Sequence, residues 1–116
     1  MTYHTQKIPF PDNTFDAVFA IEATCYGTTL EAVYSEIRRV LKPGCCFVSY
    51  EWLMTPEYDD NNPTHREIRN RIERGSGVPN LTNAKNAIKS LNAAELTLET
   101  QQDLAIPTPA NPVHWW

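Results

Sequence analysis

The chain has 116 residues, a length that suits one domain rather than two. Hydrophobic residues make up 41% and charged residues 21%, a composition that excludes disorder over most of the chain. Fourteen acidic residues against ten basic ones give a net charge of −4, so we expect no nucleic-acid partner, because such partners need a basic surface.

The first predicted element is the apolar run FDAVFAI at residues 15–21, which follows a cluster of turn residues at 9–13. A short apolar run bounded by turn residues is typical of a strand buried on both faces, as in a parallel sheet. A buried helix has the same composition, and the short length of the run favours the strand.

The clearest pattern predicts a helix over residues 29–41. Thr28 and Glu31 have the spacing of a capping box at its start, and Pro43 with Gly44 is expected to end it. The apolar residues recur at steps of three and four and therefore share one face of the helix; they are Leu30, Val33, Tyr34, Ile37, Val40 and Leu41.

A second apolar run at residues 45–54 is rich in residues that favour strands. Strand, helix and strand within about forty residues indicate a βαβ unit, in which two parallel strands are joined by a right-handed crossover. The predicted fold class is therefore α/β.

Two further helices and a weak edge strand are expected after this unit. The first helix begins at Pro63, and its thin apolar stripe, Ile68 and Ile72, predicts that it lies over the surface. Thr82 is expected to cap the second helix. Apolar residues alternate weakly over 96–103, which predicts a strand at the edge of the sheet.

The carboxyl ends of parallel strands form the binding edge of such a sheet. Glu22 and Tyr26 follow the first predicted strand, and Tyr50, Glu51 and Trp52 end the second. Neighbouring strands lie about 4.8 Å apart, so these side chains are expected to share one rim. Carboxylates beside aromatic rings suit a cation. The alternative, in which the carboxylates are merely solvated and Trp52 is a core residue, stays open.

Other features of the sequence limit the possible sites and compartments. Three cysteines, an odd number without metal-ligand spacing, predict free thiols and no metal site. No apolar run approaches the roughly 20 residues of a transmembrane helix, and the first ten residues lack the apolar core of a signal peptide. These observations predict a soluble intracellular domain, or a piece of one.

Four segments, FDAVFAIEATCYG, RRVLKPG, VSYEWLMT and NNPTHREIRNRIERGSGVPNL, carry a likeness to a known family. In them the sequence resembles the sterol 24-C-methyltransferases, especially the fungal ones, from about Lys7 onward. The resemblance implies a Rossmann-like class I methyltransferase fold, of which residues 1–116 would form the second half. The family's glycine-rich cofactor turn would lie ahead of Met1, and its sterol-specific carboxyl-terminal region would lie beyond Trp116.

The resemblance also implies a reaction, the transfer of a methyl group from S-adenosylmethionine to a sterol side-chain alkene in ergosterol-type biosynthesis. It implies a sterol as the partner and a location at the endoplasmic reticulum or lipid-droplet surface, with membrane-surface association. His4 stands where the family has an acidic residue near the adenine. The implied site residues are Glu22, Glu51 and Tyr26 for catalysis, Ile8, Pro9, Phe10, Ile21 and Glu22 for the cofactor, and Cys25, Tyr50 and Trp52 for the substrate.

Two other functions stay open beside this one. A methyltransferase acting on another isoprenoid would share the fold, and a non-catalytic remnant would act only as an interaction module. Residues 1–116 alone are expected to be inactive, because much of the implied cofactor site lies outside them. They are also expected to self-associate through open strand edges and apolar strand faces.

Overall fold

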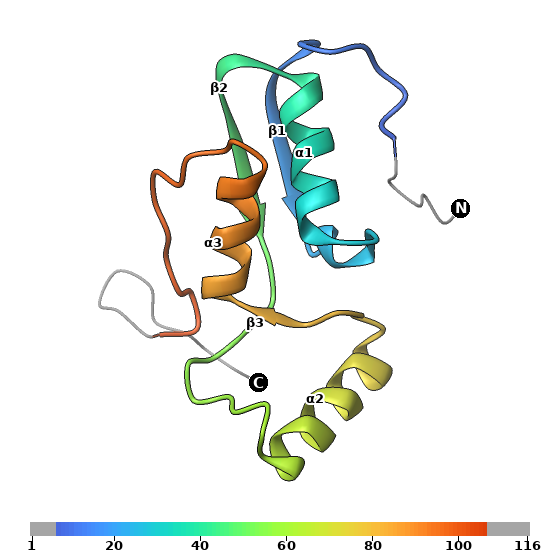
Figure 1. Ribbon diagram of the computed structural model, residues 1–116, viewed down its shortest axis with the longest axis vertical. Helices are drawn as coiled ribbons and strands as arrows, with labels where there is room; N and C mark the ends of the chain where they lie inside the picture. Colours follow the sequence, from blue (N-terminus) through green and yellow to red (C-terminus); the bar gives the residue numbers. More distant parts are fainter. Residues whose placement is uncertain (1–6, 107–116) are drawn as a thin grey trace.

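The computed structural model describes residues 7–106, so His4 and the proline-rich stretch after residue 106 lie outside the described residues (Figure 1). The elements in chain order are β1 (Phe15–Ile21), a 3₁₀ turn η1 (Thr24–Tyr26), α1 (Leu30–Val40), β2 (Leu41–Tyr50), β3 (Leu53–Met54), α2 (Pro63–Ser76), β4 (Thr82–Asn83) and α3 (Ala84–Ala93). Within residues 7–106, every helix falls short of the length and apolarity needed to cross a bilayer.

The predicted βαβ unit is confirmed, because β1 and β2 pair in parallel with α1 between them in the chain. Phe19 lies opposite Val48, and Ile21 lies opposite Tyr50. The second strand, predicted over 45–54, is divided, because β2 ends at Tyr50 and Leu53–Met54 form the separate strand β3. β3 pairs in parallel with β4, and the sequence pattern predicted neither this pair nor β4. Two-residue strands carry too little periodicity to be recognised from sequence.

The predicted helix over 29–41 is confirmed as α1, with differences at both ends. Its cap is Thr29 rather than Thr28: the Thr29 hydroxyl accepts from the backbone N–H of Ala32 at 3.1 Å. Pro43 and Gly44 do not end the helix but lie within β2, which begins directly at Leu41. The strand register shifts over this stretch, and Gly44 takes a φ of +79°, a conformation open to glycine.

The later elements confirm two predicted helices and contradict the predicted strand. The Asn62 side chain caps α2 directly before Pro63, and Asn83, rather than Thr82, caps α3. Residues 96–103 contain no strand. Leu96 packs against the buried cluster beside α1, and residues 97–103 continue as exposed irregular chain.

The face that α2 turns toward the rest of the molecule is polar. His65, Arg69 and Glu73 are partly covered, whereas Ile68 and Ile72 are 51% and 40% exposed. The side chain of Glu73 accepts from the backbone N–H of Leu81 at 2.9 Å and from Arg69 Nε at 3.1 Å. Polar contacts therefore hold α2 in place, and its apolar stripe faces outward.

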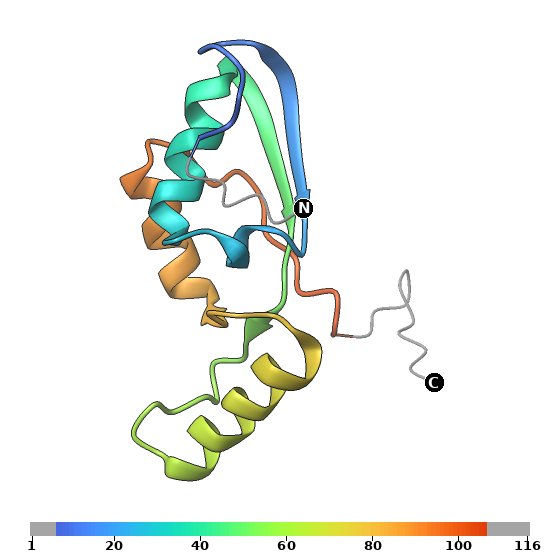
Figure 2. The same ribbon diagram turned by 90° about the vertical axis from the view of Figure 1, so that its right-hand side faces the viewer.

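The core lies on one side of the β1–β2 sheet, where α1 and α3 are packed (Figure 2). Val33, Tyr34 and Ile37 of α1 form its centre together with Ala94. Within residues 7–106, nothing covers the other side of the sheet, which we call the bare face, and the expectation of strands buried on both faces is wrong. Its exposed side chains are Phe19 (76%), Val48 (64%), Ile21 (63%) and Tyr50 (46%).

Gly27 joins η1 to α1 at a point of close packing. A Cβ added at this position would overlap Cγ2 of Val33, which is buried in the core. We expect Gly27→Ala to destabilise the fold by about 1–3 kcal/mol, as other overpacked cores do. Val33→Ala in the same chain should recover part of that loss, because it removes the overlapping methyl group. Urea unfolding of both single variants and the double variant measures the coupling, and strictly additive losses would contradict the clash.

Candidate functional site

The backbone at the carboxyl end of β1 takes an uncommon conformation. The N–H of Glu22 donates to the carbonyl of Tyr50 at 2.8 Å, which extends the hydrogen bonding between β1 and β2 by one bond. Glu22 itself has a φ of +50°. A left-handed conformation is unusual for a residue with a Cβ and is found more often at functional sites. Trp52 Nε1 donates to Glu22 Oε1 at 2.7 Å, so the carboxylate is held from the neighbouring strand's end.

The second carboxylate holds the turn that follows β1. Glu51 Oε1 accepts from the backbone N–H of Thr24 at 3.3 Å and from the hydroxyl of Ser49 at 2.9 Å. Thr24 is the first residue of η1 and is 4% exposed. Glu51 therefore joins the end of β2 to the start of the turn after β1, and its charge is partly satisfied by these donors.

Glu22, Trp52, Glu51 and Thr24 line a small pocket that is partly open to solvent. Its volume is about 20 Å³, enough for roughly one water molecule and far too small for a lipid. Both carboxylates of the lining and Trp52 follow the two strand ends, and the other lining residues come from η1, α1, β3 and the segment after α2. The lining residues are Glu22, Thr24, Cys25, Leu30, Tyr34, Glu51, Trp52, Leu53, Val78, Asn80, Leu81 and Thr82.

The pocket has a negative electrostatic environment. Burial raises the pKa of the Cys25 thiol above its usual value, and the negative charges of Glu51 and Glu22 raise it further. Burial likewise raises the pKa of Tyr34, again with a contribution from Glu51. Cys25 is therefore a neutral thiol at pH 7 rather than a nucleophilic thiolate. A pocket that disfavours added negative charge favours a cation.

The structure brings some of the predicted site residues together and separates others. Glu22, Glu51, Trp52 and Cys25 line the same pocket. Tyr26 instead donates its hydroxyl to the carbonyl of Gly77 at 2.8 Å, just after α2.

Two of the implied site residues lie on the bare face of the sheet. Tyr50 and Ile21 are opposite one another in the register, and both side chains are exposed beside Phe19 and Val48. They are not among the residues that line the pocket.

The implied cofactor segment lies along α1 and is divided between the core and the far end of β1. Ile8 packs against the buried cluster that includes Tyr34, which also lines the pocket. Pro9 is exposed beside it. The Phe10 ring meets Phe15 edge-on with centroids 4.9 Å apart, at the amino end of β1. One strand length, about 20 Å, separates that end from Glu22, so Phe10 and Glu22 do not share one small-molecule site.

Thr24, Tyr34 and the segment 78–82 line the pocket without having been predicted. The sequence pattern predicts only that Tyr34 lies on the buried helix face. A buried tyrosine hydroxyl needs a polar partner, and this requirement could have indicated that Tyr34 lies beside a polar site. The segment 78–82 comes from far along the chain, and Asn80 Nδ2 donates to the carbonyl of Cys25 at 3.3 Å. All three cysteines carry free thiols, and residues 7–106 contain no group of three metal-ligating side chains.

Comparison with known proteins relates the chain to a family. A profile of the methyltransferase domain matches residues 2–49. Sterol 24-C-methyltransferase of Yarrowia lipolytica is 54% identical over 99 residues, which are 85% of this chain and 26% of that protein. Sterol 24-C-methyltransferase ERG6 of Saccharomyces cerevisiae is 50% identical over 99 residues, with the same shares of the two chains. The chain belongs to the sterol 24-C-methyltransferase family.

Solved structures support the same fold class. The [4+2]-cyclase SpnF has a TM-score of 0.57 and 28% identity, over 77% of this chain and 28% of that one. A SAM-dependent methyltransferase of Thermotoga maritima, described as a possible histamine N-methyltransferase, has a TM-score of 0.53 and 18% identity, over 77% of this chain and 41% of that one. The chain thus has part of the class I methyltransferase fold, and it spans about a quarter of the length of the two sterol 24-C-methyltransferases.

Proposed function

We propose that this chain forms the second half of a methyltransferase domain and carries the acceptor side of its site. In a family-length protein, that site would transfer a methyl group from S-adenosylmethionine to a sterol side-chain alkene. The hydrogen bond from Trp52 to Glu22 is the main support, because it joins the IEATC and YEWLMT segments that carry the resemblance. The identity of 54% to a sterol 24-C-methyltransferase supports the substrate class.

The residues of the pocket fit the cofactor's positive charge. Two carboxylates, Glu22 and Glu51, line it beside the indole of Trp52 and the phenol of Tyr34. Carboxylates and aromatic faces both stabilise a cation such as a sulfonium. When bound, S-adenosylmethionine supplies an electrophilic methyl group on that sulfonium. Ile8, a residue of the implied adenine segment, packs against the cluster containing Tyr34, which also lines this pocket.

The chain's own residues would have distinct roles. Glu22, oriented by Trp52, would face the positive charge that develops on the alkylated alkene and accept the proton that is then lost. Glu51 would keep the turn at Thr24 in place, while Trp52 and Cys25 would form part of the substrate wall. Tyr26 and Tyr50 remain predicted site residues. Both are exposed outside the pocket, so their roles in catalysis and substrate binding depend on the parts of a family-length protein that would cover them.

Residues 1–116 alone are expected to be inactive. Their pocket of about 20 Å³ holds no sterol. Alignment of two reactants accounts for about 7–11 kcal/mol of a barrier, and a partial site does not provide it. Titration calorimetry with S-adenosylmethionine should therefore give no micromolar binding, and a tritiated-methyl transfer assay on a sterol alkene should give no turnover.

A chimera tests the function directly. We expect the Yarrowia lipolytica enzyme to keep sterol methylation when its matching 99 residues are replaced by those of this chain. In that chimera, Glu22→Gln should lower kcat by about 100-fold, the usual effect of losing a general base. Trp52→Phe keeps an aromatic ring but loses the N–H donor, and should lower kcat by roughly tenfold.

The matched control is Glu57→Gln, which changes an exposed carboxylate in the loop between β3 and α2 and should leave kcat unchanged. A folded chimera that methylates another isoprenoid but no sterol would favour the first alternative function. A folded chimera that methylates neither would favour a non-catalytic remnant. Full activity of the Glu22→Gln chimera would contradict the assigned role of Glu22.

The location at the endoplasmic reticulum or lipid-droplet surface also belongs to this proposal. Its support in the structure is α2, whose Ile68 and Ile72 face outward among arginines. An apolar stripe flanked by basic residues is typical of a helix that lies on a membrane surface.

A further inference from the structure

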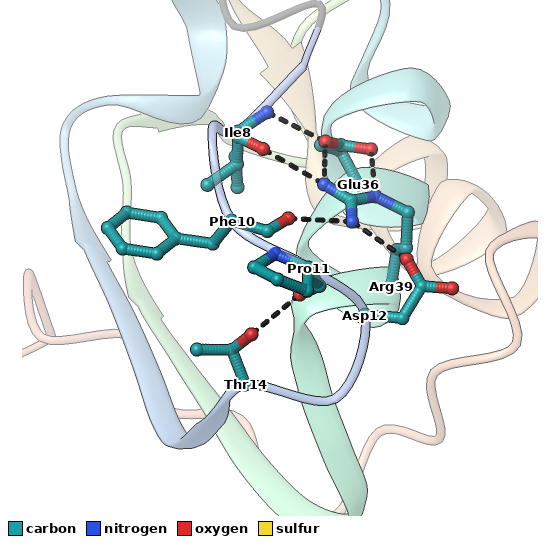
Figure 3. Close-up of polar contacts among 7 residues, drawn as sticks. All are labelled: Ile8, Phe10, Pro11, Asp12, Thr14, Glu36 and Arg39. Carbon is teal, nitrogen blue, oxygen red and sulfur yellow. Dashed lines mark hydrogen bonds and ion pairs between the residues drawn. The ribbon is translucent and has the colours of Figure 1, made fainter.

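A network of polar contacts ties the segment before β1 to the end of α1 (Figure 3). Glu36 and Arg39, one turn apart on α1, provide all of its side-chain contacts from the helix. Arg39 donates to the carbonyl of Ile8 at 3.0 Å, to the carbonyl of Phe10 at 2.9 Å and to the carboxylate of Asp12 at 2.8 Å. The Ile8 N–H donates to Glu36 Oε1 at 2.7 Å.

The two helix residues also bind one another. Arg39 Nε donates to Glu36 Oε2 at 2.9 Å, and Arg39 Nη2 donates to Glu36 Oε1. The side chain of Glu36 is 14% exposed and that of Arg39 is 25% exposed. The Arg39 guanidinium holds the pKa of Glu36 below its ordinary value. The pair is therefore charged and mutually oriented at neutral pH, which strengthens the bonds to the segment.

The contacts at Ile8 and Phe10 go to the backbone. We call these contacts of Glu36 and Arg39 with the segment before β1 the clamp. Because the clamp holds backbone groups at Ile8 and Phe10, it fixes the path of the chain there whatever side chains the segment carries. It also sets which way each side chain faces: Ile8 packs onto the buried cluster with Tyr34, while Phe10 turns away toward Phe15. Because Tyr34 lines the carboxylate pocket, the clamp connects the end of α1 to that pocket through Ile8.

We propose that Glu36 and Arg39 are positioning residues, which hold Ile8 where the adenine end of the cofactor is bound. The assignment rests on the proposed function, because Ile8 belongs to the segment implied to flank the adenine. Neither residue touches the cofactor in this role; both act through the backbone of Ile8. The planar guanidinium is needed because it reaches two carbonyls and two carboxylates at once, which a lysine ammonium does not do.

Hydrogen exchange and cofactor binding on residues 1–116 test the role together. Exchange of the backbone amides in a peptide spanning Ile8–Asp12 is followed by mass spectrometry, and S-adenosylhomocysteine is titrated at up to millimolar concentration. We expect Arg39→Lys and Glu36→Gln to speed exchange in this peptide about tenfold and to weaken S-adenosylhomocysteine binding by a similar factor.

Two controls separate this role from a general loss of stability. Arg38→Lys makes the same chemical change one residue earlier and should alter neither measurement. Ile88→Val, a small change on α3, calibrates how a slight loss of global stability affects both. Urea unfolding of every variant supplies that comparison.

The possible outcomes are distinct. Unchanged exchange in Arg39→Lys would overturn the clamp. Faster exchange with native affinity for S-adenosylhomocysteine would overturn the positioning role and leave the proposed function intact. If the ligand gives no protection at Ile8–Asp12 in the unmodified chain, the proposed cofactor role of this segment fails, and the positioning role fails with it.

Discussion

Residues 1–116, purified alone, are expected to form dimers and larger species at micromolar concentration, and Phe19→Thr with Val48→Thr is expected to yield a monomer. The two side chains are 76% and 64% exposed and lie opposite one another in the register. Burial of such a side chain contributes about 1.5–3 kcal/mol, so losing both should weaken association by roughly 100-fold or more. Threonine has a β-branched side chain, which strands favour, so the sheet should persist.

Sedimentation velocity over a concentration series measures this change, with circular dichroism to confirm that the variant is folded. The matched control is Ile68→Thr with Ile72→Thr, which removes two exposed apolar side chains from α2. If the control variant becomes monomeric while the sheet variant stays associated, the contact involves α2 and the explanation from the sheet face is wrong.

Ile37→Ala is expected to cost about 2–5 kcal/mol, which is enough to unfold much of the chain. Ile37 is 5% exposed at the centre of the cluster that joins α1, α3 and the sheet. A domain of this size has about 5–15 kcal/mol of total stability, and a core packed on one face of a two-stranded sheet places this chain at the low end. The measurement is urea unfolding in the Phe19→Thr, Val48→Thr background, so that association does not contribute.

Ile72→Ala is the matched control for this prediction. It removes the same atoms from a side chain that is 40% exposed on α2, and it should cost less than about 1 kcal/mol. Equal losses in the two variants would mean that α2 is packed as firmly as α1, contrary to its polar inner face.

The parts of the fold that depend on local pattern were predictable. The spacing of Val33, Tyr34, Ile37 and Val40 defines a helix face whatever the rest of the chain does, and these residues are buried as predicted. Two apolar runs on either side of that helix likewise predicted the parallel pair. The exact ends of the helix were harder to predict. Thr28 and Thr29 both have a hydroxyl that could cap α1, and only the folded backbone determines which one does.

Features that depend on distant contacts were not predictable from pattern. The thin apolar stripe of α2 predicted a surface helix but not which face it turns inward, and the contact between Glu73 and the N–H of Leu81 turns a polar face inward. The Phe10 ring was assigned to a cofactor site by its place in a segment, whereas its position depends on where Arg39 holds the carbonyl of the same residue. Neither contact leaves a periodic signal.

The candidate site was predicted in part. The carboxyl ends of adjacent parallel strands must meet, so Glu22, Glu51 and Trp52 could be placed together from topology alone. The left-handed φ of Glu22 could not be predicted, because sequence preferences assign that conformation to glycine or asparagine.

No linker separates α1 from β2, because α1 ends at Val40 and β2 begins at Leu41. With no linker residue to absorb a change, any rotation of the helix is transmitted to the start of the strand. A change in length can be absorbed a few residues later, within β2, where the register shifts and Pro43 and Gly44 are exposed. A peptide tag or reporter inserted at this irregularity would leave the alternation of β2 after Cys46 intact, whereas a single residue added within the regular pairing from Cys46 to Tyr50 would send inward side chains toward solvent.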